Sequence, residues 1–223
     1  MMSSMRMGEL AKSTGVPVAT LKFYLREGLL HGGAATAVNQ AEYDEGHVRR
    51  VKLVQALLHL GRLSIVDAQQ VIAAVENDAM PIHEAFGVAQ DAMVPHRDRS
   101  DARYAAALAD VDRFVRRHHL RVRPQAAVRS MLADALLGLN DCQLLPLGPT
   151  ASDEVFDSLL APLLVLAERE VGSIPATATR AKQMEQTVVG TVVFEVAYNA
   201  LRRLALEDAS ARRFAGATGK VQR

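Results

Sequence analysis

Residues 5–30 read MRMGELAKSTGVPVATLKFYLREGLL and contain two short helical segments separated by a glycine. The first predicted helix covers about residues 7–14 and stops at Gly15, because glycine readily ends a helix. The second begins at Pro17, a residue suited to a first helical turn, and runs to Glu27 before the next glycine. Two short helices joined by a glycine-containing turn have the outline of a helix-turn-helix.

The second predicted helix has two different faces. Its packing face consists of Pro17, Val18, Leu21, Tyr24, Leu25 and Gly28. Its opposite face carries Ala19, Thr20, Lys22, Phe23, Arg26 and Glu27. In a DNA major groove, Lys22 and Arg26 would neutralise phosphates, while Thr20 and Phe23 would contact base edges or thymine methyl groups. Packing of Phe23 against the following loop is the alternative for that residue, and the sequence leaves it open.

Further elements follow this helical pair. Residues 31–42, HGGAATAVNQAE, have small side chains and no helical period, which predicts a hairpin or loop. A third helix is expected from Asp44, a good N-cap, to Gly61. Ser64 and Asp67 resemble a capping box that opens a fourth helix, ending near residue 76.

Residues 5–30, together with YDEGHVRRVKLVQALLHLGRLSIVDAQQVI at residues 43–72, resemble the MerR family of transcription regulators. Family members read roughly G-E-L-A-x-x-T-G-V-S-x-x-T-L-R-Y-Y-E-x-x-G-L-L in the first of these stretches. The resemblance spans about residues 7–76. It implies a winged helix-turn-helix, a homodimer bound to an inverted repeat in double-stranded promoter DNA, and RNA polymerase as a partner. It also implies regulation by bending and untwisting the promoter spacer, whereas the sequence leaves activation or repression open.

The resemblance also assigns DNA contacts. The recognition-helix positions are Thr20, Lys22, Phe23, Tyr24 and Arg26. Phe23 stands where the family usually has the first tyrosine of a pair, and Leu25 replaces the usual glutamate.

The wing departs further from the family pattern, which commonly ends in G-Y-R-x-Y. Here residues 39–43 read NQAEY, so Ala41 falls where the arginine would be and Glu42 adds a negative charge. The neutral donors left for DNA are Asn39, Gln40 and Tyr43. Arg49 and Arg50, early in the third helix, are candidates for phosphate contacts, and a solvated helix face is an equally good interpretation.

Composition predicts a mainly α-helical chain. Of the 223 residues, 49% are hydrophobic and only 4% aromatic, with abundant alanine, leucine and arginine. The net charge is +1, and residues 1–76 contain eight Lys/Arg and seven Asp/Glu. DNA binding therefore depends on the placement of basic groups and not on their excess.

Several classes of site and location are disfavoured. The single Cys142 excludes an internal disulfide, and the scattered histidines give no usual metal-binding pair, so no metal site is predicted. A glycine-rich phosphate loop, a nucleophile motif and a convincing carboxylate pair are all missing, so we expect neither an enzyme nor a cofactor. No signal peptide or membrane-spanning run is visible, which predicts a cytoplasmic protein without a membrane partner.

The domain boundary is expected near residue 77, giving a DNA-binding domain at 1–77 and an all-helical dimerisation or effector domain at 78–223. Helices are expected between Pro81 and Pro95, and over residues 101–119, 124–140 and 179–214. Another should begin at Ser152 and be kinked or broken by Pro162. The middle of the last helix, residues 188–206, is apolar on nearly every side and is expected at the centre of a bundle.

Two roles are predicted for the helical part. The candidate dimer stripe consists of Tyr104, Leu108, Val111, Val115 and His118, with packing inside the subunit as the alternative. The candidate walls of a small-molecule effector pocket are Met131, Leu136, Leu160, Leu164, Val189, Val193, Phe194 and Tyr198. Phe194, Glu195 and Tyr198 are the predicted ligand contacts, and ordinary core packing is the alternative. A helical protein–protein interaction module without an effector remains the alternative function.

Overall fold

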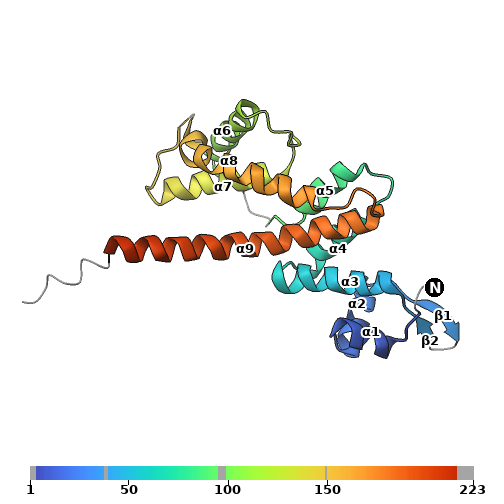
Figure 1. Ribbon diagram of the computed structural model, residues 1–223. Helices are drawn as coiled ribbons and strands as arrows, with labels where there is room; N and C mark the ends of the chain where they lie inside the picture. The colour runs from blue at the N-terminus through green and yellow to red at the C-terminus, as the bar shows by residue number, and fades with distance from the viewer. Residues whose placement is uncertain (1–3, 38–39, 95–98, 149, 215–223) are drawn as a thin grey trace, which may run out of the picture.

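The computed structural model describes residues 4–37, 40–94, 99–148 and 150–214. Helices dominate these residues, and a small antiparallel hairpin is inserted near the N-terminus (Figure 1). The prediction of a mainly α-helical protein with an N-terminal winged helix-turn-helix is confirmed.

The N-terminal elements follow the predicted order. Helices α1 (Met7–Thr14) and α2 (Val18–Arg26) are joined by a turn in which Gly15 has a φ of +70°. Strands β1 (Ala34–Ala37) and β2 (Gln40–Glu42) pair antiparallel and form the wing.

Capping residues set the starts of the next two helices. Helix α3 (Glu45–Gln55) begins after Asp44, whose side chain accepts a hydrogen bond from the His47 amide at 3.1 Å. It continues into η1 (Ala56–Leu60), a single π-helical turn. Helix α4 (Ile65–Glu76) begins after Ser64, whose hydroxyl oxygen accepts from the Asp67 amide at 3.1 Å.

Five further helices lie among the described residues that follow. They are α5 (Ile82–Asp91), α6 (Tyr104–Arg117), α7 (Ala127–Asp141), α8 (Ala151–Gly172) and α9 (Arg180–Phe214). Of the two predicted effects of Pro162, a break is wrong, since α8 continues through it, and a kink stays a prediction. Ser158, whose carbonyl group loses its usual amide partner, is exposed, so water can satisfy that group. Ser152 lies inside α8 and is buried.

The first hydrophobic core joins the N-terminal elements to α5 and to the first half of α9. Leu21, Leu57 and Val71 share it with Met184 and Val192 of α9. Gly61 permits this contact, because a β-carbon at this position would lie 3.3 Å from Val192 and 2.9 Å from the Leu57 carbonyl oxygen. The core thus extends across the predicted boundary at residue 77, and the division into two domains stays a prediction.

The second core lies among α6, α7 and α8. Ala107, Val111 and Val115 of α6 pack there against Ala133 and Leu136 of α7. The stripe on α6 therefore packs within its own subunit, and the prediction that it forms a dimer interface is wrong. An apolar stripe has the same spacing whichever surface covers it, so the sequence left both possibilities open.

The prediction that residues 188–206 lie at the centre of a bundle is wrong beyond Val192, the last residue of α9 that the first core buries. Leu201, Leu204 and Leu206 are 60%, 62% and 52% exposed. The helix is longer than the surface on which it packs, and its C-terminal half extends away from α1–α4 (Figure 1). None of the helices in the described part of the chain is long and apolar enough to cross a membrane.

Candidate nucleic-acid interface

Helix α2 has an inner face in the first core and an outer face open to solvent. Leu21 and Tyr24 are 0% and 2% exposed, whereas Lys22 and Arg26 are exposed. Thr20 and Phe23 are half-buried beside them. Anchoring through the inner face fixes the direction in which the two basic side chains project, as recognition of a nucleic acid requires.

Arg26 is held by its neighbours on the outer face. Its guanidinium carbon lies 5.1 Å from the centre of the Phe23 ring, and its Nε atom lies 3.1 Å from Oε1 of Glu27. Phe23 also packs against the first core, and its contact with DNA stays a prediction. The Arg26–Glu27 pair is exposed and therefore weak, and a phosphate group can compete for the same guanidinium.

The C-terminal end of α2 is fixed by a contact that the sequence did not reveal. Nε2 of Gln69, on α4, donates a hydrogen bond to the Glu27 carbonyl oxygen at 2.6 Å. The two residues are 42 positions apart. Only the fold brings them together, and no local pattern indicated the contact.

Two predicted DNA contacts are wrong because their side chains are buried. Tyr24 lies three residues after Leu21 and therefore shares its inner face. Tyr43 is 5% exposed, and its ring packs edge-on against His47 with centroids 5.1 Å apart. Its backbone also pairs with Met5 through hydrogen bonds of 2.8 Å in both directions. Neither phenol is available to DNA.

The described residues of the wing carry no basic side chain. Gln40 is exposed on β2 beside Glu42, and Asn39 lies outside the described residues. Gly33 precedes β1 where the strands approach closely, since a β-carbon there would lie 2.4 Å from the Glu42 carbonyl oxygen. The described part of the wing offers neutral donors at most, so positive charge for DNA has to come from other elements, of which α2 carries Lys22 and Arg26.

The two arginines of α3 have different environments. Arg50 is buried, with 7% of its side chain exposed, and pairs with Glu76 of α4. Its predicted phosphate contact is therefore wrong. The side chain of Arg49 is 49% exposed, and its Nε atom lies 3.3 Å from Oε2 of Glu185 on α9. Arg49 thus links α3 to the last helix, a role that sequence reasoning missed.

The predicted effector-pocket residues are brought together only in part, since Val189, Val193 and Phe194 line one cleft and the others do not. Leu136 belongs to the second core and Val189 packs on the first, while Met131 is 48% exposed. The reason is that α9 does not enter the α6–α8 bundle. Of the three predicted ligand contacts, Phe194 and Tyr198 stack with ring centres 5.8 Å apart, and the Tyr198 hydroxyl donates to Glu170. Glu195 is exposed on α9.

A group of possible metal ligands lies between α6 and α8. His118, Asp153 and Asp157 bring ligand atoms within 4.8 Å of one another. Arg117 pairs with Asp153 at 2.7 Å and with Asp157 at 3.1 Å, and Arg113 pairs with Asp153 at 2.9 Å. These guanidinium groups already balance the carboxylates, and we assign no metal to the group.

The helix-turn-helix, the hairpin after it and the basic outer face of α2 together define a winged helix-turn-helix DNA-binding protein. Residues 5–75 match the family model described as "MerR HTH family regulatory protein". A 56-residue segment is 45% identical to the nodulation protein NolA of Bradyrhizobium elkanii, covering 25% of this chain and 26% of that protein. The chain therefore spans about a quarter of the length of this curated relative.

A solved structure resembles the whole chain. It is that of the "putative transcriptional regulator SCO5550" from Streptomyces coelicolor A3(2), with 31% sequence identity and a TM-score of 0.70. The similarity covers 94% of this chain and 98% of that one. The chain belongs to the MerR family of DNA-binding transcriptional regulators.

Proposed function

We propose that this protein binds promoter inverted repeats sequence-specifically as a homodimer, with α2 of each protomer in a major groove. The observation that carries the proposal is the exposure of Lys22 and Arg26 on a helix anchored by buried Leu21 and Tyr24. Lys22 and Arg26 contact phosphates, and Thr20 and Phe23 read base edges or thymine methyl groups. Gln40 adds a neutral contact from the wing.

A homodimer is supported by the exposed apolar face of α9. An isolated helix of a few turns is only marginally stable in water, and helices usually owe their stability to tertiary packing. Leu201 and Leu204 are 60% and 62% exposed, so the residues that the structure describes do not bury them. We propose that a second copy of this chain covers this half of α9, which would place two α2 helices on one DNA site.

Regulation is proposed to act through the shape of the promoter and on RNA polymerase. The wing has no arginine to anchor it, so affinity rests on two α2 helices and on the deformability of the DNA between the half-sites. A change in the relative position of the two protomers would then alter the bend of the promoter.

The experiment first selects fragments from the source genome with the purified protein and identifies their shared sequence. The Lys22→Ala/Arg26→Ala variant is then compared with wild type on the selected site and on a shuffled copy. Specific affinity should fall at least about tenfold, and the slope of log affinity against log salt should decrease by roughly 0.9 for each phosphate that the variant no longer neutralises.

The matched control is Arg116→Ala/Arg121→Ala, which removes the same charge from exposed positions in and after α6. This control should bind DNA like wild type, and both variants should keep the wild-type melting temperature. Equal DNA affinity of the α2 variant and its control would show that α2 does not read the DNA.

A further inference from the structure

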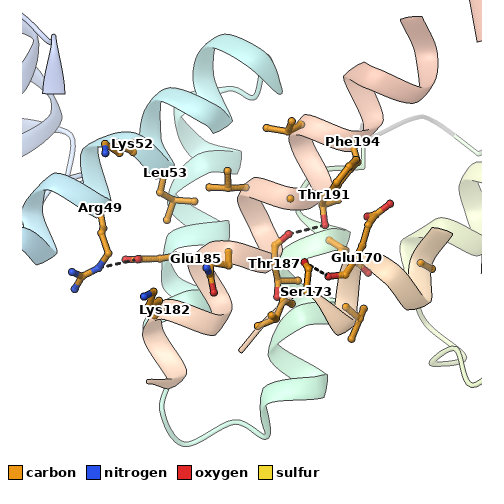
Figure 2. Close-up of a pocket in the computed structure, with 18 residues that line it drawn as sticks. Arg49, Lys52, Leu53, Glu170, Ser173, Lys182, Glu185, Thr187, Thr191 and Phe194 are labelled. Carbon is orange, nitrogen blue, oxygen red and sulfur yellow. Dashed lines mark hydrogen bonds and ion pairs between the residues drawn. The ribbon is translucent and has the colours of Figure 1, made fainter. Parts of the chain in front are cut away.

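A cleft of about 610 Å³ lies between α3 of the DNA-binding part and helices α8 and α9. Figure 2 shows Arg49 and Lys52 on one side of it and Glu170 and Phe194 toward the other. Its volume lies within the range of small-molecule sites, which are mostly apolar with a few placed polar groups. The cleft differs from the bundle pocket expected from the sequence, with which it shares only part of α9.

The walls of the cleft are mostly apolar, with Glu170 and Ser173 as polar groups on the side away from Arg49 (Figure 2). Leu53 of α3, Val171 and Ile174 near the end of α8, and Val189 and Val193 of α9 line it, with Phe194 beside them. Thr187 and Thr191 also line it, but their hydroxyl groups donate to carbonyl oxygens of their own helix at 2.9 Å and 3.0 Å. The central part therefore suits an apolar body.

One end of the cleft carries an excess of positive charge. Arg49, Lys52 and Lys182 line this end together with one carboxylate, that of Glu185. Glu185 pairs with Arg49 at 3.3 Å, whereas neither lysine forms an ion pair with any other residue that the structure describes. Two lysine charges are thus available at the end of an apolar cleft.

The cations at this end are exposed to water, whereas the carboxylate beside them is largely buried. Only 15% of the Glu185 side chain is exposed, and its partial burial raises its pKa in spite of the neighbouring Arg49. The attraction between an anion and the two exposed lysines is screened by salt, so the affinity for an anion should fall as salt is raised.

We propose that the cleft binds a small amphipathic anion, a carboxylate with an apolar body, and that this ligand is the effector of the regulator. The carboxylate lies at the end formed by Lys52 and Lys182, and the apolar body lies against Val189, Val193 and Phe194. The regulatory part rests on the proposed function. The regulatory role follows from the position of the cleft, because a ligand in it touches both α9 and α3, and α3 belongs to the DNA-binding part.

The test uses the full chain and sodium decanoate, kept below the concentration at which it forms micelles, with decanol and decyltrimethylammonium as neutral and cationic probes. Binding is measured by displacement of the fluorescent anion 8-anilinonaphthalene-1-sulfonate, in the absence of DNA. Decanoate should bind once per chain, and each of the other two probes should bind at least about tenfold more weakly.

Two variants locate the site. Lys52→Glu/Lys182→Glu should weaken decanoate at least about tenfold and remove the preference for an anion. Val193→Trp should fill the cleft and abolish binding, whereas Val196→Trp, exposed on the same helix and outside the cleft lining, should bind like wild type. Retained decanoate binding in both cleft variants would overturn the proposed site.

Operator DNA gives a separate readout. Saturating decanoate should change the operator affinity of wild type and leave that of Lys52→Glu/Lys182→Glu unchanged. If decanoate binds in the cleft but operator affinity stays constant, the role as effector site is overturned. If wild type bound no specific DNA, either in the absence or in the presence of decanoate, the proposed function itself would be contradicted. Failure of the effector role and failure of the proposed function are therefore distinguishable.

Discussion

In the proposed complex Arg26 contacts a phosphate, and Glu27 competes with that phosphate for its guanidinium group. Glu27→Gln should raise the affinity for the selected DNA site by roughly fivefold, since an exposed ion pair is worth up to about 1 kcal/mol. The backbone carbonyl of residue 27 would still accept the hydrogen bond from Gln69. Equilibrium binding at several salt concentrations measures the effect.

Glu84→Gln is the matched control for this change, because Glu84 is exposed on α5 and loses the same charge. It should leave DNA affinity at the wild-type value. A Glu27→Gln variant no tighter than this control would show that Arg26 does not contact phosphate.

We expect His31 to give the stability of the DNA-binding part a dependence on pH. Its ring stacks on that of His47 with centroids 4.2 Å apart, and burial, followed by the nearby His47 and Arg50, lowers its pKa from 6.5. The unfolded chain therefore takes up this proton more readily than the folded chain. The neutral ring stabilises the fold above pH 6.5, and this contribution is lost as the pH falls through the lowered pKa.

The measurement is thermal unfolding of wild type and His31→Gln from pH 8 to pH 5, with His83→Gln on α5 as the control. The melting temperature should fall less with acidification in His31→Gln than in the other two proteins. If the melting temperatures of all three proteins fell equally with acidification, His31 would not be the source of the pH dependence.

For single residues, helical periodicity predicted which side chains of α2 face the core and which face solvent, and it predicted little beyond that. Lys22 and Arg26 were placed on the outer face correctly. Tyr24 and Tyr43 are predicted DNA contacts by family resemblance, and Arg50 is one by its place early in the third helix, yet each is buried in this fold. Helical geometry already put Tyr24 beside Leu21, so for this residue the periodicity was the better guide. The Arg50–Glu76 pair joins two helices and has no local signal.

The wing is the element most sensitive to a single methyl group. Gly33→Ala would place a β-carbon 2.4 Å from the Glu42 carbonyl oxygen, so the strands would have to separate. We expect a loss of stability of about 1–3 kcal/mol, typical of overpacking, and weaker DNA binding. Gly32→Ala is the control, because no atom lies within 4 Å of its added β-carbon. Equal melting temperatures of the two variants would show that the approach of the strands is not tight.

The exposed half of α9 is the element that we assign to the homodimer. Leu201→Glu/Leu204→Glu should shift the sedimentation coefficient from that of a dimer to that of a monomer, because two charges would enter an apolar interface. Leu144→Glu, at a position that is 72% exposed after α7, should leave the dimer intact. A dimer that survives the double change would place the interface elsewhere.

The starts of α3 and α4 were predictable from single capping residues, because a cap is a local interaction. The covering of an apolar face is not local. The stripe on α6 and the apolar middle of α9 both predict burial, but neither shows which surface provides it. The stripe on α6 is buried within the subunit, whereas half of α9 remains exposed. The π-helical turn at η1 likewise had no signal in the sequence.

For the molecule as a whole, the last helix is part of the core of the DNA-binding segment. Met184 is 0% exposed among residues of the first core. Met184→Ala should therefore lower the free energy of unfolding by about 2–5 kcal/mol and lower the melting temperature of the DNA-binding part along with it. Hydrogen exchange of the buried amides of α2 and α3 reports on that part directly.

Val66→Ala is the control, since Val66 is 61% exposed on α4 and its truncation should change stability by less than about 0.5 kcal/mol. If Met184→Ala accelerated exchange in α9 alone, the N-terminal segment would be stable without the last helix, and the predicted boundary at residue 77 would be a true domain boundary.

Sharing of the first core between residues 5–75 and Met184–Val192 has a consequence for synthesis on the ribosome. The DNA-reading segment leaves the exit tunnel first, but the residues that cover Leu57 and Gly61 emerge more than a hundred codons later. Until then an apolar surface stays open, which chaperones and proteases recognise. A product truncated before Met184 should be degraded and should not accumulate as a DNA-binding fragment that occupies promoters without responding to a signal.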